Sequence, residues 1–242
     1  MAKKERVKTL QAGSFYYCIQ YTPLAGGVKK ERRAARQFVS SLVRESINFR
    51  TSKEKLWLIL VGTFDPEKDL YVSLTYRDAD RPKTPELAAK RFKSFLRQLR
   101  EYRKSKGQET IYVYANEGLH SGGKYHHHLL INSTGDDYAI MRKLWEKNGT
   151  QVEILPYNCK SHWSHAEYLT KEPGANGRRH VGDRMWKASR NVKRPVITYE
   201  DVPADSELVP PPGAYVEHRA SEQNSYGRFQ YLECRLEKTA TE

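Results

Sequence analysis

Three consecutive histidines, His126, His127 and His128, lie in an otherwise apolar segment. In a β-strand the side chains alternate between two faces, so His126 and His128 would point one way and His127 the other. Two imidazoles about 7 Å apart along one strand can bind one cation together. Glu117 precedes them, and the glycines in between predict a turn that returns the chain beside it. The pattern therefore predicts a metal site formed by Glu117, His126 and His128.

The ligand types indicate which cation this site would hold. Neutral imidazole suits several transition metals, and an added carboxylate favours Mn²⁺ or Mg²⁺ over a closed zinc site. Three protein ligands leave coordination positions open for a phosphate oxygen and water, as a catalytic site requires. A His-x-His pair also occurs by chance on exposed strands, so the prediction depends on the hairpin that brings in the carboxylate.

Tyr168 and Lys171 lie three residues apart in a segment expected to be helical, and so on one helix face. A phenol with a pKa of about 10 is a weak nucleophile at neutral pH. A nearby ammonium group, a helix N-terminus and a metal-bound phosphate all favour the phenolate. Attack on a phosphodiester would give a covalent phosphotyrosine, from which the strand can be rejoined. Because the chain has 16 tyrosines, such a pair also arises by chance, so this prediction depends on the metal site.

The elements that must position these residues follow from hydrophobic periodicity. Residues 69–76 alternate as a half-buried strand does. Residues 85–106 have helical spacing, with Thr84 as N-cap, Pro85 at the first position and Gly107 after the end. The inward stripe of this helix is expected to be Ala88, Phe92, Phe95, Leu99 and Tyr102.

Further strands are expected at residues 110–115, 125–131 and 150–155. Two more helices are expected between and after them. The first is capped by Asp136 or Asp137 and ends at Asn148-Gly149, and the second begins at Ser164 in a Ser-x-x-Glu capping box. The inward side chains of the first are expected to be Ile140, Met141, Leu144 and Trp145.

This order of elements predicts an α+β fold: one antiparallel sheet of about five strands with helices on one face. We assign it to residues 55–195. Residues 1–54 are expected to be a basic helical N-terminal extension, with a helix from Lys29 to Val43. Residues 196–242 are expected to be a Pro-containing linker at Val209–Gly213 and a tail with little structure of its own.

Composition narrows the class of partner. The 242 residues carry a formal net charge of +13 and the pI is about 9.5, which favours binding of polyanions. Simple solubility, ribosome binding and membrane-surface binding would also fit this charge. No apolar stretch is long enough to cross a membrane and no secretory signal is present, so a cytoplasmic location is expected. Cys18, Cys159 and Cys234 form no CxxC pair and are expected to be reduced thiols.

Taken together, these motifs resemble the HUH endonucleases, and most closely the rolling-circle replication initiators (Rep proteins) of phages, plasmids and small circular DNA viruses. The resemblance rests on the strand VSLTY, on Glu117 nine positions before His126, on HHHLLI, and on YLTK with Tyr168 and Lys171. The tract Met185–Asn191 also looks like a segment of phage and plasmid members. The likeness covers about residues 69–195.

The resemblance implies an RRM-like sheet with the metal site on its face. It implies an enzyme that nicks single-stranded origin DNA, keeps the 5′ phosphate on Tyr168 and releases a 3′-OH primer. Glu117, His126 and His128 would be the metal ligands, and Lys171 would assist Tyr168. Lys124, Trp186, Lys187 and Arg190 are further candidates for DNA contacts.

The chain departs from the family pattern in three ways. His127 fills a position that is usually apolar. Only one tyrosine occupies the motif, so a second strand transfer would need a second subunit or re-use of Tyr168. No G-x-x-x-x-G-K-[ST] motif occurs, so a host helicase, with a host polymerase, is the expected partner. The location would be the bacterial cytoplasm for a phage or plasmid protein and the nucleus for that of a eukaryotic virus.

Three other functions remain open on the sequence alone. An IS200-type transposase would use the same chemistry to join two element ends. A relaxase fits less well, because relaxases have three histidine ligands and an N-terminal tyrosine. A non-enzymatic module could bind single strands by stacking and phosphate contacts alone.

Overall fold

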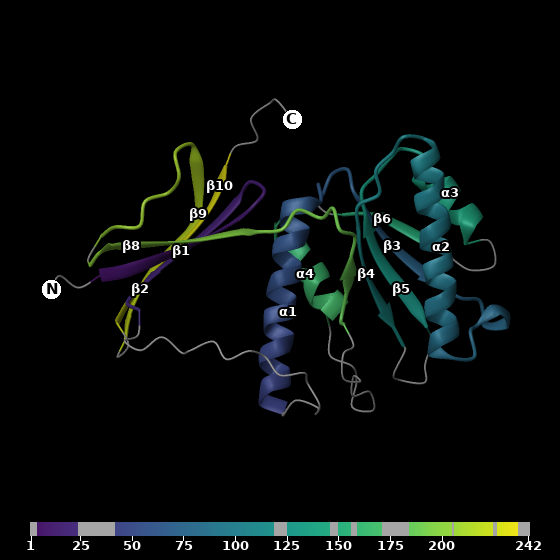
Figure 1. Ribbon diagram of the computed structural model, residues 1–242, viewed down its shortest axis with the longest axis horizontal. Coiled ribbons are helices and arrows are strands. Elements are labelled where there is room, and N and C mark those ends of the chain that lie inside the picture. Colours follow the sequence, from purple (N-terminus) through teal and green to yellow (C-terminus); the bar gives the residue numbers. More distant parts are fainter. Residues whose placement is uncertain are drawn as a thin grey trace. The chain divides into compact units, whose positions relative to one another are not determined.

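The computed structural model describes residues 4–23, 42–118, 125–145, 150–155, 159–170, 184–204, 206–224 and 227–236, without the side chains of residues 42–47 and 159–161. The described strands form two separate five-stranded antiparallel sheets (Figure 1). Contacts between residues divide the chain into two compact units. Unit 1 comprises Met1–Ala34, Val61–Thr63 and Lys193–Glu242, and unit 2 comprises Ala35–Leu60 and Phe64–Val192.

The sheet of unit 2 contains the strands predicted around the histidines. Its strand order is β6-β3-β5-β4-β7, and all its pairs are antiparallel. The bounds are β3 Leu70–Thr75, β4 Tyr112–Glu117, β5 His126–Ile131, β6 Thr150–Ile154 and β7 Lys187–Ala188. The prediction of an α+β fold with a five-stranded antiparallel sheet is therefore confirmed.

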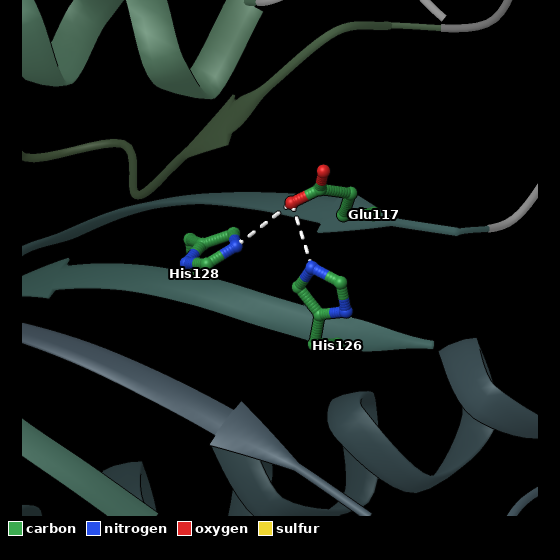
Figure 2. Close-up of side chains that lie close together, drawn as sticks. All are labelled: Glu117, His126 and His128. Atoms are coloured by element: carbon green, nitrogen blue, oxygen red, sulfur yellow. Dashed lines mark hydrogen bonds and ion pairs between the residues drawn. The ribbon is translucent and has the colours of Figure 1, made fainter. Parts of the chain in front are cut away.

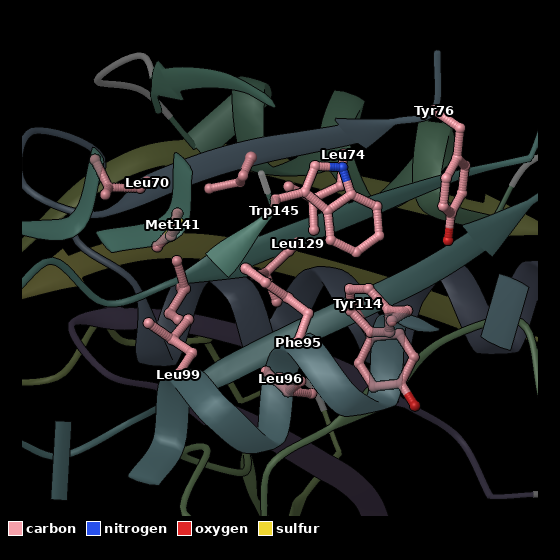
Figure 3. Close-up of a cluster of buried hydrophobic side chains, with 13 residues drawn as sticks. Leu70, Leu74, Tyr76, Phe95, Leu96, Leu99, Tyr114, Leu129, Met141 and Trp145 are labelled. Carbon is pink, nitrogen blue, oxygen red and sulfur yellow. The ribbon is translucent and has the colours of Figure 1, made fainter. Parts of the chain in front are cut away.

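Helices cover both faces of this sheet, so the prediction that they lie on one face is wrong. The bounds are α1 Leu42–Thr63, α2 Pro85–Ser105, α3 Asp137–Leu144 and α4 Cys159–Thr170, with a short 3₁₀ helix at Asp78–Asp80. Helices α2 and α3 pack on one face, and α1 and α4 pack on the other (Figure 1). The first core holds Leu74, Phe95, Leu129 and Trp145 (Figure 3). The second holds Leu60, Leu130 and Leu169.

Helix α2 has the expected ends and the expected buried stripe. The Thr84 side chain accepts a hydrogen bond from the Leu87 amide at 3.3 Å, and Pro85 starts the helix. Gly107 follows the end with a φ of 71°, a left-handed conformation that glycine adopts without strain. Tyr102, expected on the stripe, is only half-buried and hydrogen-bonds Asp136 at the surface.

The ends of the other helices differ in part from the prediction. Met141 and Trp145 of the α3 region are buried, and Ile140 and Leu144 pack beside them. Helix α4 begins at Cys159, so Ser164 is an interior residue and not the N-cap. The expected stop at Asn148-Gly149 lies outside the described residues, as does most of the helix expected from Lys29 to Val43.

The sheet of unit 1 overturns the prediction for both ends of the chain. It contains β1 Lys4–Ala12, β2 Phe15–Tyr21, β8 Val196–Pro203, β9 Ala214–Asn224 and β10 Gly227–Leu236, in the order β8-β1-β2-β10-β9. Residues 4–21 are thus strands and not part of a helical extension, and residues 196–236 are not an unstructured tail. The cause is pairing between distant segments, as in the register of Arg6 with Asp201. The core of this unit includes Cys18, Leu232 and Cys234, and both cysteines are free thiols.

Candidate metal centre and nucleophile

The register of β4 and β5 brings the three predicted ligands together. Glu117 lies directly opposite His126, and Ala115 lies opposite His128. Residues opposite each other in an antiparallel pair share a sheet face, so Glu117 is beside His126 and diagonal to His128. Gly118, with a φ of 80°, begins the turn after β4. The predicted hairpin therefore forms from the pairing of two adjacent strands.

The three side chains converge on a small volume. The same Glu117 oxygen, Oε2, lies 2.8 Å from Nε2 of His126 and 3.0 Å from Nε2 of His128 (Figure 2). One ligand atom from each residue lies within 4.8 Å of the others. Two nitrogen lone pairs cannot face one carboxylate oxygen this closely without a proton or a cation between them. The donor set and its spacing thus fit a divalent cation bound by two imidazoles and one carboxylate.

His128 is the most firmly held of the three ligands. Its side chain is 6% exposed, against about a quarter for Glu117 and His126. Its other nitrogen, Nδ1, lies 2.6 Å from the Tyr71 hydroxyl and 3.1 Å from Oγ of Ser73. Hydrogen bonding at Nδ1 fixes the ring orientation and leaves Nε2 for a metal, as is usual for metal-bound histidine.

Tyr71 and Ser73 are site residues that our sequence analysis missed. They occupy alternate positions of β3, and Ser73 lies opposite His128 in the register. Burial raises the pKa of Tyr71, and the negative charges of Tyr168 and Glu117 raise it further, so its hydroxyl stays protonated. The two polar positions of DLYVSLTY were the available signal, but only the pairing of β3 with β5 shows which residue they contact.

His127 points to the other face of the sheet, as predicted. It is fully buried against Phe92, and its ring nitrogens lie 2.8 Å from the Tyr76 hydroxyl and 2.8 Å from Oδ1 of Asn116. Burial lowers its pKa to about 3, and the neighbouring histidines add to this effect. His127 is therefore a neutral core residue whose polar atoms are satisfied, which explains a histidine at a position expected to be apolar.

Tyr168 lies on the same sheet face as the three ligands. Helix α4 packs on this face through Ala166 and Leu169, and the Tyr168 ring meets the His128 ring edge-on, with centroids 4.8 Å apart. Tyr168 remains 41% exposed, so a substrate can reach it. His165, one helical turn earlier, contacts Tyr71 with ring centroids 4.9 Å apart. The nucleophile predicted from sequence is thus placed next to the predicted metal ligands.

The other predicted site residues are placed less clearly. Lys171 and Lys124 lie outside the described residues. Trp186 packs against the α1 side of the core and donates a hydrogen bond to Ser52 at 3.0 Å, so its indole is engaged in packing. Lys187 and Arg190 are exposed, and their contribution to DNA binding stays a prediction.

The tract Met185–Asn191 has a structural role in the sheet. Strand β7 pairs with β4 through Ala188 and Lys187. Ser189 exchanges hydrogen bonds with Tyr112, through its amide at 2.9 Å and its hydroxyl at 3.1 Å. The tract therefore supports the strand that ends at Glu117.

Comparison with known proteins gives one match. Residues 69–181 match a family model described as replication-associated protein, of the ORF2 type. Searches of curated proteins and of solved structures find no match. The matched segment runs from β3 through α4 and includes the three ligand residues and Tyr168, whereas the strands of unit 1 fall outside it. The match is consistent with a rolling-circle replication initiator.

Proposed function

We propose that the protein is a metal-dependent endonuclease and strand transferase that nicks single-stranded origin DNA and starts rolling-circle replication. The observation that carries the proposal is the position of Tyr168, whose ring contacts His128 beside Glu117 and His126. A nucleophile, a cation site and an open approach on one sheet face are the parts that phosphodiester cleavage requires. The match to a replication-associated family supports the biological role.

In the proposed reaction the Tyr168 oxygen forms a bond to phosphorus and the P–O3′ bond breaks. The phenol proton passes to solvent, and the departing 3′ oxygen gains a proton. A divalent cation held by Glu117, His126 and His128 would polarise the scissile phosphate and offset the charge that develops on it. The 5′ phosphate stays on Tyr168, so the linkage keeps the energy needed to rejoin the strand. We assign an assisting role to Lys171, and Mn²⁺ or Mg²⁺ as the cation.

The partners in this proposal follow from what the described chain offers. The substrate is a single-stranded origin, and a host helicase and polymerase would extend the 3′-OH. No described helix is long and apolar enough to cross a membrane. Cleavage of a hairpin end in place of an origin would instead favour a transposase.

The test is an adduct assay. The protein is incubated with a pool of single-stranded oligonucleotides and Mn²⁺, and covalent complexes are separated on a denaturing gel. We expect an adduct with the wild-type protein, and none after Tyr168→Phe or in EDTA. Tyr138→Phe is the matched control, because Tyr138 is a similarly exposed tyrosine at 52%. An adduct that survives Tyr168→Phe rules out this nucleophile, and oligonucleotide binding without any adduct favours a non-enzymatic binding module.

A further inference from the structure

The outer face of α2 carries an uninterrupted row of five basic side chains. These are Lys90, Lys93, Arg97, Arg100 and Lys104, all exposed. Their spacings of three, four, three and four residues place them on one line along the helix. The line is about 21 Å long at 1.5 Å per residue. It lies on the α2 side of the sheet, whereas the candidate metal centre lies on the α4 side.

The charges in this row are poorly balanced by the protein itself. Neighbouring like charges three or four residues apart destabilise an isolated helix, and solvated helix faces usually mix both signs. In the described part of the chain the only ion pair made by the row joins Arg97 to Glu101 at 3.1 Å, with both side chains more than 60% exposed. An external polyanion would relieve this repulsion.

The helix that presents the row is already ordered. Its inner face is anchored by Phe92, Phe95 and Leu99, which are at most 2% exposed. Binding a ligand along the outer face would therefore require no folding of the helix, only the ordering of long side chains. Beyond Lys104 the row borders a polar pocket of about 430 Å³ that Asn191 also lines, although the pocket includes the carboxylates of Glu101 and Glu109.

The surface chemistry distinguishes between two forms of DNA. Proteins that bind single strands combine basic groups with exposed aromatic rings on which bases stack. The only large exposed apolar residue described on α2 is Leu87, whereas α4 exposes Trp163 and Tyr168. A straight basic row without aromatic rings fits the phosphates of a duplex, and 21 Å corresponds to about six base pairs.

We propose that the basic row of α2 binds the phosphate backbone of double-stranded DNA, independently of base sequence. The row would hold the duplex next to an origin while the opposite sheet face receives the single strand. This inference goes beyond strand cleavage and does not depend on it.

The test measures DNA binding in EDTA, where no metal-dependent cleavage takes place. Fluorescence anisotropy reports binding of a labelled duplex of about 20 base pairs, and of a single strand of the same length, between about 50 and 200 mM salt. The row variant carries Lys90→Gln, Lys93→Gln, Arg97→Gln, Arg100→Gln and Lys104→Gln, since glutamine keeps a helix propensity close to that of lysine. The control carries five such changes elsewhere, at Lys4, Arg50, Lys55, Lys68 and Lys193, all exposed.

We expect the row variant to bind duplex at least about 10-fold more weakly than the control does. Its plot of log affinity against log salt should be shallower than that of wild type by up to about 4.5, because each lost phosphate contact contributes about 0.9. The charge-preserving variant Lys90→Arg/Lys93→Arg/Lys104→Arg should bind like wild type. Equal losses in the row variant and the control would overturn the proposal. So would a greater loss for the single strand than for the duplex, or no duplex binding by wild type.

These outcomes are separate from those of the adduct assay. A protein that forms no tyrosine adduct can still lose duplex affinity through the row. A protein that forms the adduct normally can still show no effect of the row on duplex binding. The two proposals therefore succeed or fail independently.

Discussion

His127 shows how three identical side chains in one strand take different roles. The pleat sends it into the α2 core, while its neighbours face Glu117. The assignment of the two outer histidines as ligands predicts a clear separation of phenotypes among the three positions.

We expect His126→Ala and His128→Ala each to weaken Mn²⁺ binding by more than roughly 100-fold, since losing only an outer partner of a ligand already costs about 10- to 100-fold. His127→Leu should leave Mn²⁺ affinity unchanged. It should instead lower the free energy of unfolding by about 1–3 kcal/mol for each buried partner left unsatisfied, Tyr76 and Asn116. Titration calorimetry and urea unfolding measure the two effects. A loss of metal affinity in His127→Leu at full stability would contradict this division of roles.

Tyr71 is expected to act through His128, not on the substrate directly. Removing its hydroxyl in Tyr71→Phe leaves Ser73 as the remaining partner of Nδ1. We therefore expect Mn²⁺ affinity to fall by about 10-fold, and by up to about 100-fold in the double variant with Ser73→Ala. Excess Mn²⁺ should restore most of the adduct yield, because the nucleophile is intact. Yield that stays low at saturating Mn²⁺ would show that the hydroxyl has a more direct part in the reaction.

At the scale of elements, the junction of α2, β5 and α3 depends on a buried ion pair. Arg103 is fully buried and contacts the Asp137 carboxylate at 2.5 Å and both oxygens of Asn132 at 2.9 Å. Asp137 also accepts hydrogen bonds from the Thr134 and Gly135 amides. The pair thus fixes the C-terminal end of α2 to the start of α3.

We expect Arg103→Met to lower the free energy of unfolding by about 3–5 kcal/mol, because it leaves a buried carboxylate without its cation. The same substitution at Arg97, exposed on the same helix, should change it by less than about 0.5 kcal/mol. Urea unfolding followed by tryptophan fluorescence gives both values. Equal effects at the two positions would mean that the pair contributes little.

The same pair predicts a pH dependence. Burial alone would raise the pKa of Asp137, but hydrogen bonds from Thr134 and the Arg103 guanidinium lower it below its ordinary value. The unfolded chain, with a pKa of about 3.9, therefore takes up the proton first as the pH falls. The contribution of Asp137 to stability should be complete above about pH 4–5 and lost as the pH falls through the folded pKa. The stability gap between wild type and Asp137→Asn should narrow below about pH 4, and a constant gap would contradict the assignment.

How far the sequence predicts the fold depends on whether the signal is local. The helix from Pro85 and the strands of unit 2 have strong periodicity and capping residues, and they form as expected. Strands β8 and β9 are largely exposed and polar, so they have little periodic signal. Their partners are distant, since β1 pairs with β8 nearly two hundred residues away. The aromatic and β-branched run Phe15–Tyr21 was a usable strand signal for β2.

The candidate site was predictable to a similar degree. The alternation of a strand separates His126 and His128 from His127, and a short hairpin brings back Glu117. The contact of Tyr168 with His128 could not be derived in this way, because it depends on where α4 packs. The roles of Tyr71 and Ser73 were hidden for the same reason: strand pairing between β3 and β5 is a tertiary property.

At the scale of the whole molecule, each unit has its own sheet and its own core. All four tryptophans, Trp57, Trp145, Trp163 and Trp186, belong to unit 2. Cys18 and Cys234 are buried in the core of unit 1. Tryptophan fluorescence and thiol reactivity therefore report on the two units separately, once Cys159 is replaced by serine.

Because the units have separate cores, we expect two unfolding transitions in urea. Leu232→Ala, which creates a cavity at a fully buried position of unit 1, should destabilise that unit by about 2–5 kcal/mol and move only the thiol transition to lower urea. Arg103→Met should move only the fluorescence transition. If each substitution shifts both transitions together, the two sheets unfold as one cooperative structure, and the strands of unit 1 then stabilise the sheet that carries the candidate metal centre.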